Sequence, residues 1–239
     1  MIGPSVTNKL NRMTIALGMV GADGILLAAD QLLVQDDPWN EKTFDEHEGI
    51  CKIRVSEKCF VACVRVGDYV TKAVADRFLE QLESKEFDSS DTTRQLEKIA
   101  HDILAQEMEK LPQPVMCNRS LLIVFYGQPN PQLWRLRISP PRIAAEYIPT
   151  ITIAGAHGNR GRFFDHYYKD HMPIEKLTFL AGHIVLSAAV FDSAMIRGLD
   201  VALFRANGEH SLLTGQEKQL IREQSSALTA LMHERLTPG

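Results

Sequence analysis

MTIALGMVGADGILLAAD, residues 13–30, is the stretch of this sequence that decides its fold. Thr14 to Val20 and Ile25 to Ala29 are apolar and partly β-branched, which predicts two β-strands. The Asp23-Gly24 dipeptide between them is typical of a tight hairpin turn. Because a hairpin returns the chain to where it began, we expect Asp30 to lie close to Thr14 although sixteen positions separate them.

Further along the chain, several blocks match a known family in order and spacing. They are Cys51–Val55 with its Lys52, Phe60–Val64 before Gly67-Asp68, Ile151–Gly158 with its glycine-rich end, and Phe191-Asp192 followed by Leu199–Phe204 and Asn207-Gly208. Together with the hairpin they resemble proteasome β-subunits and their bacterial relatives, in which a threonine begins the first strand and an aspartate follows the second. The resemblance covers nearly the whole chain from Thr14 onward. It implies a four-layer αββα sandwich of the N-terminal nucleophile hydrolase type.

Length and composition predict one globular domain. The chain has 239 residues, of which 45% are hydrophobic and 23% charged. Nothing between Thr14 and Leu236 looks like a linker, so we expect a proteasome-like domain over Met13–Gly239 behind a polar tail or mis-assigned leader, Met1–Arg12. The net charge of −4 argues against a nucleic-acid partner. The longest apolar stretch, Ile184–Phe191, is shorter than the roughly 20 residues that a membrane span requires.

The order of the predicted elements indicates an α+β protein with helices on the outer faces of antiparallel sheets. An acidic loop is expected over Asp36–Glu48. Apolar residues at helical spacing predict helices, and short β-branched runs predict strands. The predicted helices are Asp68–Leu82, Thr92–Leu111, Arg160–Lys169, Ile174–Ser193 and Gln216–Arg235; the later strands are Leu121–Tyr126, Leu133–Ile138, Ile143–Tyr147, Thr150–Ala154 and Asp200–Arg205.

The chemistry that the resemblance implies uses a threonine as nucleophile. A hydroxyl needs a base within hydrogen-bond reach, and a free α-amine on the same residue supplies one. A neighbouring lysine favours the neutral amine, and a carboxylate holds the lysine in place. The resemblance assigns these roles to Thr14, Lys52 and Asp30, with Asp192 as a further site carboxylate. An amide N–H near Gly67 would face the developing oxyanion.

Each residue has an ordinary explanation when it is taken alone. Thr14 is a β-branched strand residue, Lys52 fits a solvated strand face, and Asp30 fits a turn. The chain also departs from the family: Ala156 and Met195 stand where the family has serines, and Leu32 replaces a common arginine. The family pockets use residues that flank the lysine, here Ile50 and Arg54, and Arg54 would favour acidic or small side chains at the cut.

No cofactor or metal is expected. The group Asp165, His166, Asp170 and His171 lacks the spacing of a metal site and is better explained as a polar helix end. The four cysteines, Cys51, Cys59, Cys63 and Cys117, show no zinc-like pairing and fit buried free thiols. Free thiols favour a cytoplasmic protein.

The internal position of Thr14 poses the main difficulty, because an internal residue has no free amine. The favoured hypothesis is that Met13 is the true start, since methionine is excised before a small residue such as threonine. Self-cleavage of the tail is the other route, although family precursors usually have glycine before the threonine.

The leading hypothesis is a cytoplasmic threonine-type endopeptidase that cleaves peptides or unfolded proteins within a homo-oligomeric ring. A regulatory ATPase partner and the ring size cannot be inferred from these residues. A non-catalytic structural subunit, in which the tail persists and buries Thr14, is the alternative, and a small-molecule amidase on the same fold is a third. Ala156, Met195 and the tail favour the structural alternative.

Overall fold

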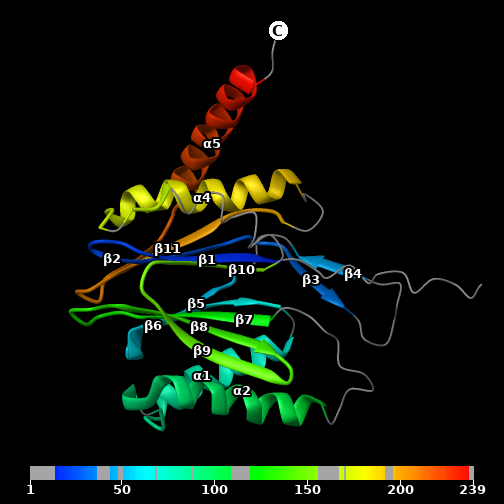
Figure 1. The fold of residues 1–239 in the computed structure, drawn as a ribbon, viewed down its shortest axis with the longest axis vertical. Helices are drawn as coiled ribbons and strands as arrows, with labels where there is room; N and C mark the ends of the chain where they lie inside the picture. Colours follow the sequence, from blue (N-terminus) through cyan, green and yellow to red (C-terminus); the bar gives the residue numbers. More distant parts are fainter. Residues whose placement is uncertain are drawn as a thin grey trace, which may run out of the picture.

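The computed structural model describes residues 14–36, 44–47, 51–67, 69–87, 89–108, 119–155, 167–169, 171–191 and 196–236. Its body consists of two five-stranded antiparallel sheets stacked face to face, with helices outside both (Figure 1). No helix in these ranges is long and apolar enough to cross a membrane.

The first sheet contains the predicted hairpin. Its strand order is β10 (Ile151–Gly155), β1 (Ile15–Val20), β2 (Gly24–Ala29), β11 (Asp200–Arg205) and β12 (His210–Leu212). In the hairpin, Val20 lies opposite Ile25 and Ala16 lies opposite Ala29. The turn closes when the Gly21 amide donates to the Gly24 carbonyl at 2.8 Å. The Asp-Gly signal therefore places a tight turn between the strands, as the sequence predicted.

The second sheet is a meander whose strand order follows the sequence. It comprises β5 (Ile53–Ser56), β6 (Val61–Val66), β7 (Arg119–Phe125), β8 (Gln132–Ser139) and β9 (Arg142–Ile148), and a short 3-10 helix, η1 (Glu57–Cys59), joins β5 to β6. A separate two-stranded ribbon is formed by β3 (Leu33–Asp36) and β4 (Phe44–His47). The expectation of a loop over Asp36–Glu48 was therefore wrong, since β4 lies inside this segment.

Helices cover the outer face of each sheet (Figure 1). The second sheet carries α1 (Tyr69–Glu83) and α2 (Thr92–Met108), with the 3-10 helix η2 (Ser89–Asp91) before α2. The first sheet carries α4 (Ile174–Phe191), and α5 (Gly215–Leu236) packs on α4. These four helices agree closely with the predicted ones. Most of the predicted helix Arg160–Lys169 lies outside the described residues.

Strand β2 is buried along its whole length because both of its faces are covered. Leu26 and Ala28 pack with α4, whereas Ile25, Leu27 and Ala29 pack against the second sheet. A strand between two apolar layers needs apolar residues at every position, which explains the unbroken ILLAA run. The same packing fixes the end of β2, and with it Asp30.

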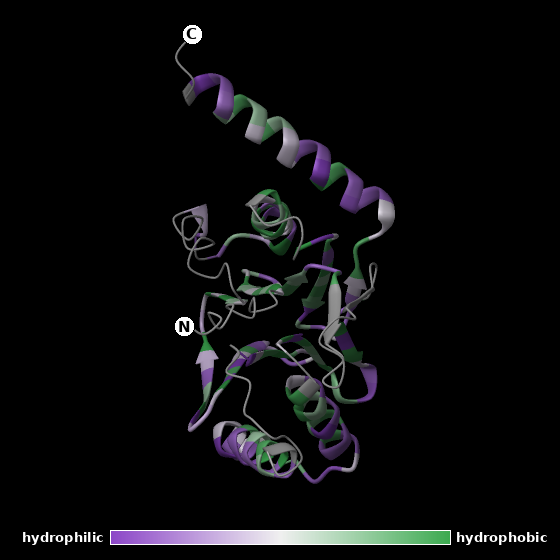
Figure 2. Cartoon of the chain, turned by 90° about the vertical axis from the view of Figure 1, so that its right-hand side faces the viewer, coloured by the Kyte–Doolittle hydropathy of each residue, from purple (hydrophilic) through white to green (hydrophobic). Residues whose placement is uncertain are grey.

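Helix α5 leaves the body of the protein soon after it begins. Ile221 and Ser225 are buried against α4, but Leu231 and Met232 are 50% and 40% exposed. Figure 2 shows the later turns of α5 running clear of the sheets. The first sheet is thus covered by α4, with α5 stacked outside it rather than beside it. The described structure is two antiparallel five-stranded sheets with four helices, and the prediction of a four-layer αββα sandwich of the N-terminal nucleophile hydrolase type was wrong. Helical periodicity does not say whether a helix packs on a sheet or on another helix.

Acid is expected to loosen α5 through a buried histidine. His183 is 4% exposed, its Nδ1 lies 2.7 Å from the Ser225 hydroxyl, and burial lowers its pKa. Since the unfolded chain then binds a proton more readily, the free energy of unfolding falls as the pH drops below the ordinary histidine value of about 6.5. Chemical denaturation of wild type and His183→Gln at pH 7.5 and 5.5 measures the effect. The variant should lose less stability on acidification, whereas a matched change of the exposed His101 to Gln should leave the wild-type pH dependence intact.

Candidate active site

Thr14 lies immediately before β1, at the mouth between the two sheets, and its side chain is half-buried. The hairpin brings Asp30 to it: the Asp30 amide donates to the Ile15 carbonyl at 3.2 Å, and the Ile15 amide donates to Asp30 Oδ1 at 3.0 Å. On the other side, β10 ends at Gly155 beside the Thr14 carbonyl, where a Cβ on Gly155 would lie 1.8 Å from that oxygen. Only glycine fits this close approach, and Gly155 also has a positive φ of 107°.

Lys52 completes a chain of three side chains. It precedes β5 and is 2% exposed. Its ammonium donates to Asp30 Oδ2 at 2.8 Å and to Thr14 Oγ1 at 3.0 Å. The structure therefore brings together three residues from three segments of the chain.

The Asp30 carboxylate accepts three hydrogen bonds. Besides Lys52 and the Ile15 amide, the Leu32 amide donates to Oδ2 at 3.2 Å, and Asp30 itself is fully buried. A buried charge is costly unless it is paired and hydrogen-bonded, and here both conditions are met. The position of Leu32, where the family has an arginine, thus supplies a backbone donor to Asp30.

Burial is the largest influence on the ionisation of both charged groups. It raises the pKa of Asp30 and lowers the pKa of Lys52, and the attraction between the two opposes each shift. The nearby Arg65 cation lowers the pKa of Lys52 further. A lysine whose pKa is lowered gives up its proton more easily than an exposed lysine does. Lys52 is consequently placed to donate a hydrogen bond to the Thr14 oxygen and to stabilise negative charge on it.

The other two residues predicted for the site, Gly67 and Asp192, stay predictions. Gly67 follows β6, is exposed and has a φ of 120°, and in the described residues no hydrogen bond joins its amide to Thr14. Asp192 lies outside the described residues. So do Met13, Cys117, Ala156, Met195 and three members of the predicted polar helix end, Asp165, His166 and Asp170. The fourth, His171, is exposed. Within the described ranges no group of three or more His, Cys, Asp or Glu residues is arranged to hold a metal ion.

A second buried ion pair, between Asp200 and Lys218, lies beside the end of β2. No role was predicted for it from the sequence. Asp200, the first residue of β11, is 3% exposed; its Oδ1 accepts from Lys218 Nζ at 2.7 Å and from Gln31 Nε2 at 2.8 Å. Its charge raises the pKa of Lys52. Gln31 directly follows Asp30, so this pair fixes the end of β2 from the side of α5. The sequence signal that could have indicated this pair is an aspartate at the start of an otherwise apolar strand.

Removing Lys218 is expected to destabilise the protein, because it leaves the Asp200 carboxylate buried with Gln31 as its donor. Breaking a buried ion pair costs several kcal/mol, and the partial exposure of Lys218 reduces this to about 2 kcal/mol for Lys218→Met. Chemical denaturation measures the loss. The double variant with Asp200→Asn removes the orphaned charge and should regain part of it. Equal stability of the single variant and wild type would show that the pair contributes nothing.

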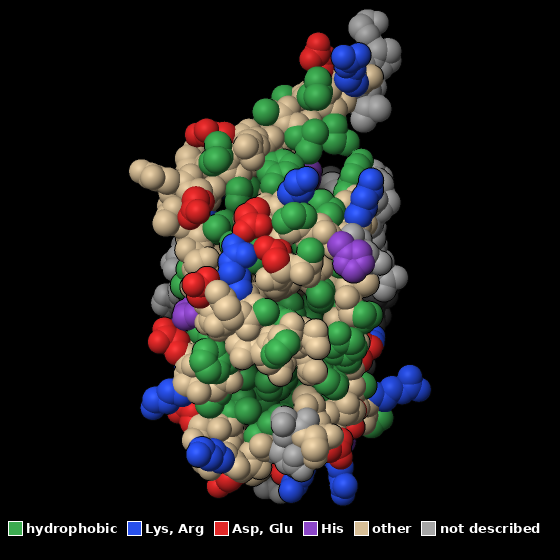
Figure 3. Space-filling model, turned by 90° about the vertical axis from the view of Figure 1, so that its left-hand side faces the viewer, with side chains coloured by type: hydrophobic (Ala, Val, Ile, Leu, Met, Phe, Trp, Pro, Cys, Tyr) green, Lys and Arg blue, Asp and Glu red, His purple; other side chains and the backbone are tan. Residues whose placement is uncertain are grey.

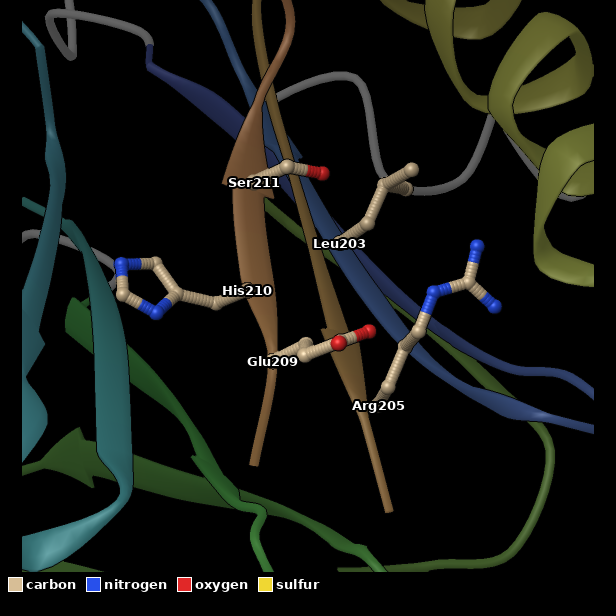
Figure 4. Close-up of a pocket in the computed structure, with 5 residues that line it drawn as sticks. All are labelled: Leu203, Arg205, Glu209, His210 and Ser211. Atoms are coloured by element: carbon tan, nitrogen blue, oxygen red, sulfur yellow. The ribbon is translucent and has the colours of Figure 1, made fainter. Parts of the chain in front are cut away.

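A shallow pocket lies at the far end of the first sheet. It is lined by Leu203, Arg205, Glu209, His210 and Ser211 (Figure 4). Arg205 is already bound by Asp23 and Glu175. Arg205 lies opposite Gly24 at the start of β2, whereas Asp30 follows the end of β2, so the pocket is roughly 20 Å from Thr14 along the strand. Seen from this end, acidic and basic side chains are interspersed on the upper half of the surface (Figure 3). The pocket takes no part in the Thr14 centre.

Comparison with known proteins relates this fold to solved structures only: no family model matches the chain, and no curated protein does. The helical assembly of the Anbu complex from Pseudomonas aeruginosa matches with a TM-score of 0.71 at 15% identity, over 94% of this chain and 98% of that chain. Anbu, an ancestral β-subunit, from Yersinia bercovieri matches with a TM-score of 0.67 at 12% identity over the same shares. Anbu from Hyphomicrobium sp. strain MC1 matches with a TM-score of 0.66 at 14% identity, over 92% of this chain and 96% of that chain.

These matches correct the family named from the sequence. The assignment to the proteasome β-subunit-like family was wrong, because the matching structures are Anbu proteins, a proteasome-related but distinct family. At these identities the likeness establishes the fold: two antiparallel sheets with four helices, as in Anbu.

Proposed function

We propose that this chain is a threonine-type hydrolase of peptide bonds, with Thr14 as its nucleophile, and that it works as a subunit of a homo-oligomer. One observation carries the proposal: the Thr14 hydroxyl lies 3.0 Å from a buried lysine whose charge is held by Asp30 at 2.8 Å. A hydroxyl nucleophile is activated by a base, here the α-amine of the same residue, while the lysine cation stabilises the oxygen and the carboxylate orients the lysine. The helical assembly formed by the Anbu complex of Pseudomonas aeruginosa supports the oligomer.

In the proposed reaction, Thr14 Oγ forms a bond to the carbonyl carbon of the scissile peptide. Its proton passes to the α-amine of Thr14 once the preceding residues are absent, and Lys52 stabilises the oxygen as it loses the proton. The C–N bond then breaks, and the leaving amine takes up the proton. Water cleaves the resulting ester by the reverse transfers, releasing the acid and restoring the hydroxyl.

The ion pair serves this step in two ways. The lysine charge disfavours protonation of a neighbouring amine, so it keeps the α-amine available as a base. The Asp30 carboxylate, fixed by the Ile15 and Leu32 amides, prevents Lys52 from turning towards solvent. Both effects depend on burial, because water would screen the charges.

Covalent trapping tests the proposal. We would incubate protein isolated from its own cell with a peptide β-lactone, which acylates a nucleophilic hydroxyl by ring opening, and measure the intact mass. Addition of one lactone, mapped to a peptide that begins with Thr14, is the expected result. A form expressed from Met13 should behave alike once its methionine is removed. Protein that keeps residues 1–13 and gains no mass would contradict the hydrolase and favour a structural subunit.

A further inference from the structure

The turn that carries Asp30 is held by the segment that enters β11. Gln31 follows Asp30; its amide donates to the Arg197 carbonyl at 2.7 Å, and its side-chain Nε2 donates to Asp200 Oδ1 at 2.8 Å. A Cβ on Gly198 would lie 2.7 Å from the Gln31 Cβ, and Gly198 has a positive φ of 73°, so this close approach requires glycine. Gln31 is therefore fixed through both its main chain and its side chain.

The position of Gln31 affects how the Asp30 carboxylate is held. Oδ2 of Asp30 accepts from Lys52 Nζ at 2.8 Å and from the Leu32 amide at 3.2 Å. Since Leu32 is the residue after Gln31, the direction of its amide depends on the conformation of Gln31. A loose Gln31 would weaken this hydrogen bond and let the carboxylate, together with Lys52, move away from Thr14.

Asp200 is buried and uses only one of its two oxygens. It is 3% exposed, and Oδ1 accepts from Gln31 and, at 2.7 Å, from Lys218 Nζ. No described residue donates a hydrogen bond to Oδ2. A buried acceptor without a donor is costly, and apolar residues can often replace a buried ion pair without loss of stability. Stability alone therefore does not explain a carboxylate at this position.

Asp200 also lies close to the segment that leads into β5 and contains Lys52. Burial raises the pKa of the Cys51 thiol, and the Asp200 charge raises it further. Burial lowers the pKa of Lys52, and the charges of Asp30 and Asp200 oppose that shift. One carboxylate is thus near both segments that supply charged groups to the candidate active site.

We propose that Asp200 is a positioning residue for the reaction at Thr14, and that it acts through Gln31. The inference rests on the proposed hydrolase function. Asp200 fixes the turn that holds the Asp30 carboxylate, and so keeps the lysine ammonium against the hydroxyl. Because Lys218 belongs to α5, the contact of this helix with the start of β11 supports the reaction through the same carboxylate.

Two double variants of equal charge test the role of the acceptor oxygen. Lys218→Met with Asp200→Asn keeps an oxygen for Gln31, because the NH2 group takes the place of the unused Oδ2. Lys218→Met with Asp200→Leu has nearly the same shape but no acceptor. Neither variant buries an unpaired charge, so both should fold, and chemical denaturation checks this.

The measurement is the rate of acylation by the peptide β-lactone, on protein expressed from Met13 that begins with Thr14. Its dependence on lactone concentration separates the maximal rate from the concentration that gives half of it. The leucine variant should lose about tenfold or more in maximal rate, with the half-maximal concentration within about twofold, because orientation rather than binding is lost. The asparagine variant should stay within about threefold of wild type in both values, because the acceptor remains.

Gln31→Met examines the same contact from the other side. It removes the donor but keeps the ion pair of Lys218 and Asp200, so it should lose about as much of the maximal rate as the leucine variant. It also covers the case in which the leucine variant does not fold. Gln219→Met makes the same change on the exposed side of α5, where Gln219 donates to Glu223 at 3.0 Å, and should keep the wild-type rate.

The outcomes distinguish this inference from the function on which it rests. A maximal rate that is unchanged in Gln31→Met, or equal in the asparagine and leucine variants, would overturn the role of Asp200 while the hydrolase proposal stands. Wild-type protein that begins with Thr14 and is not acylated would overturn the hydrolase, and the Asp200 assignment with it.

Discussion

Replacing Lys52 by methionine is expected to lower the free energy of unfolding by about 3 to 5 kcal/mol and to remove hydrolytic activity. The change keeps the length of the side chain but takes away the charge that compensates Asp30, which is fully buried. Two backbone amides still donate to the carboxylate, yet they do not neutralise it. Chemical denaturation and peptide hydrolysis measure the two effects separately.

The pH dependence of this variant provides a sharper check. Without Lys52, the pKa of Asp30, already raised by burial, rises further. A carboxylate whose folded pKa lies above its unfolded value destabilises the fold at high pH and ceases to do so when it is protonated. The stability deficit of Lys52→Met relative to wild type should therefore be largest near pH 8 and should shrink as the pH falls. A deficit independent of pH would show that Asp30 is not left as an unpaired charge.

A double-mutant cycle separates the pair from its surroundings. Asp30→Asn alone also destabilises, because its NH2 group replaces one of the two oxygens that accept from the Ile15 and Leu32 amides. In Lys52→Met/Asp30→Asn no charge is buried, so the double loss should be smaller than the sum of the single losses by about 1 kcal/mol or more. Additive losses would contradict direct coupling between the two residues. Activity should stay absent in the double variant, since part of the stability is regained without the cation that stabilises the Thr14 oxygen.

The part of the site that the sequence predicted is the part set by local structure. Thr14 and Asp30 meet because one tight turn and two apolar strands of equal length leave the chain no other arrangement. Lys52 was placed by the resemblance of its block, Cys51–Val55, to the lysine-bearing strand of a family rather than by any local rule. That resemblance named the wrong family, because the solved structures that match the fold are Anbu proteins, a proteasome-related but distinct family.

The parts that were missed depend on how distant elements dock. Lys218 reaches Asp200 because the first turn of α5 lies against the start of β11, and apolar spacing along α5 gives no sign of that contact. Helix α5 points outward because it packs on α4 through Ile221 and Ser225. Helical periodicity does not show whether the apolar side of a helix packs on another helix or on a sheet. The ribbon of β3 and β4 was missed because its acidic composition favours a loop, and cross-strand hydrogen bonds overrode that preference.

Removing the hydroxyl of Thr14 is expected to abolish hydrolysis while leaving the fold intact. Thr14→Val keeps the β-branched shape that suits the start of β1, and it deletes the oxygen that accepts from Lys52 at 3.0 Å. Lys52 retains its ion pair with Asp30, so the free energy of unfolding should change by less than about 1 kcal/mol. The rate should fall by about a thousandfold or more, because loss of the nucleophile leaves only binding and electrostatic contributions.

Thr14→Ser provides the matched control, since it keeps the hydroxyl and loses only a methyl group. Serine frees χ1, so the nucleophile is less well oriented, and a fall of about tenfold is expected rather than complete loss. The same pair of variants discriminates in the β-lactone experiment, where the serine form gains the mass of one lactone and the valine form does not. Retention of hydrolysis by Thr14→Val would assign the chemistry to another group. In that event the contact of Lys52 with Thr14 and Asp30 would have a structural role at the edge of the sheet. The stability loss expected for Lys52→Met would still hold, because it follows from the ion pair and not from the reaction.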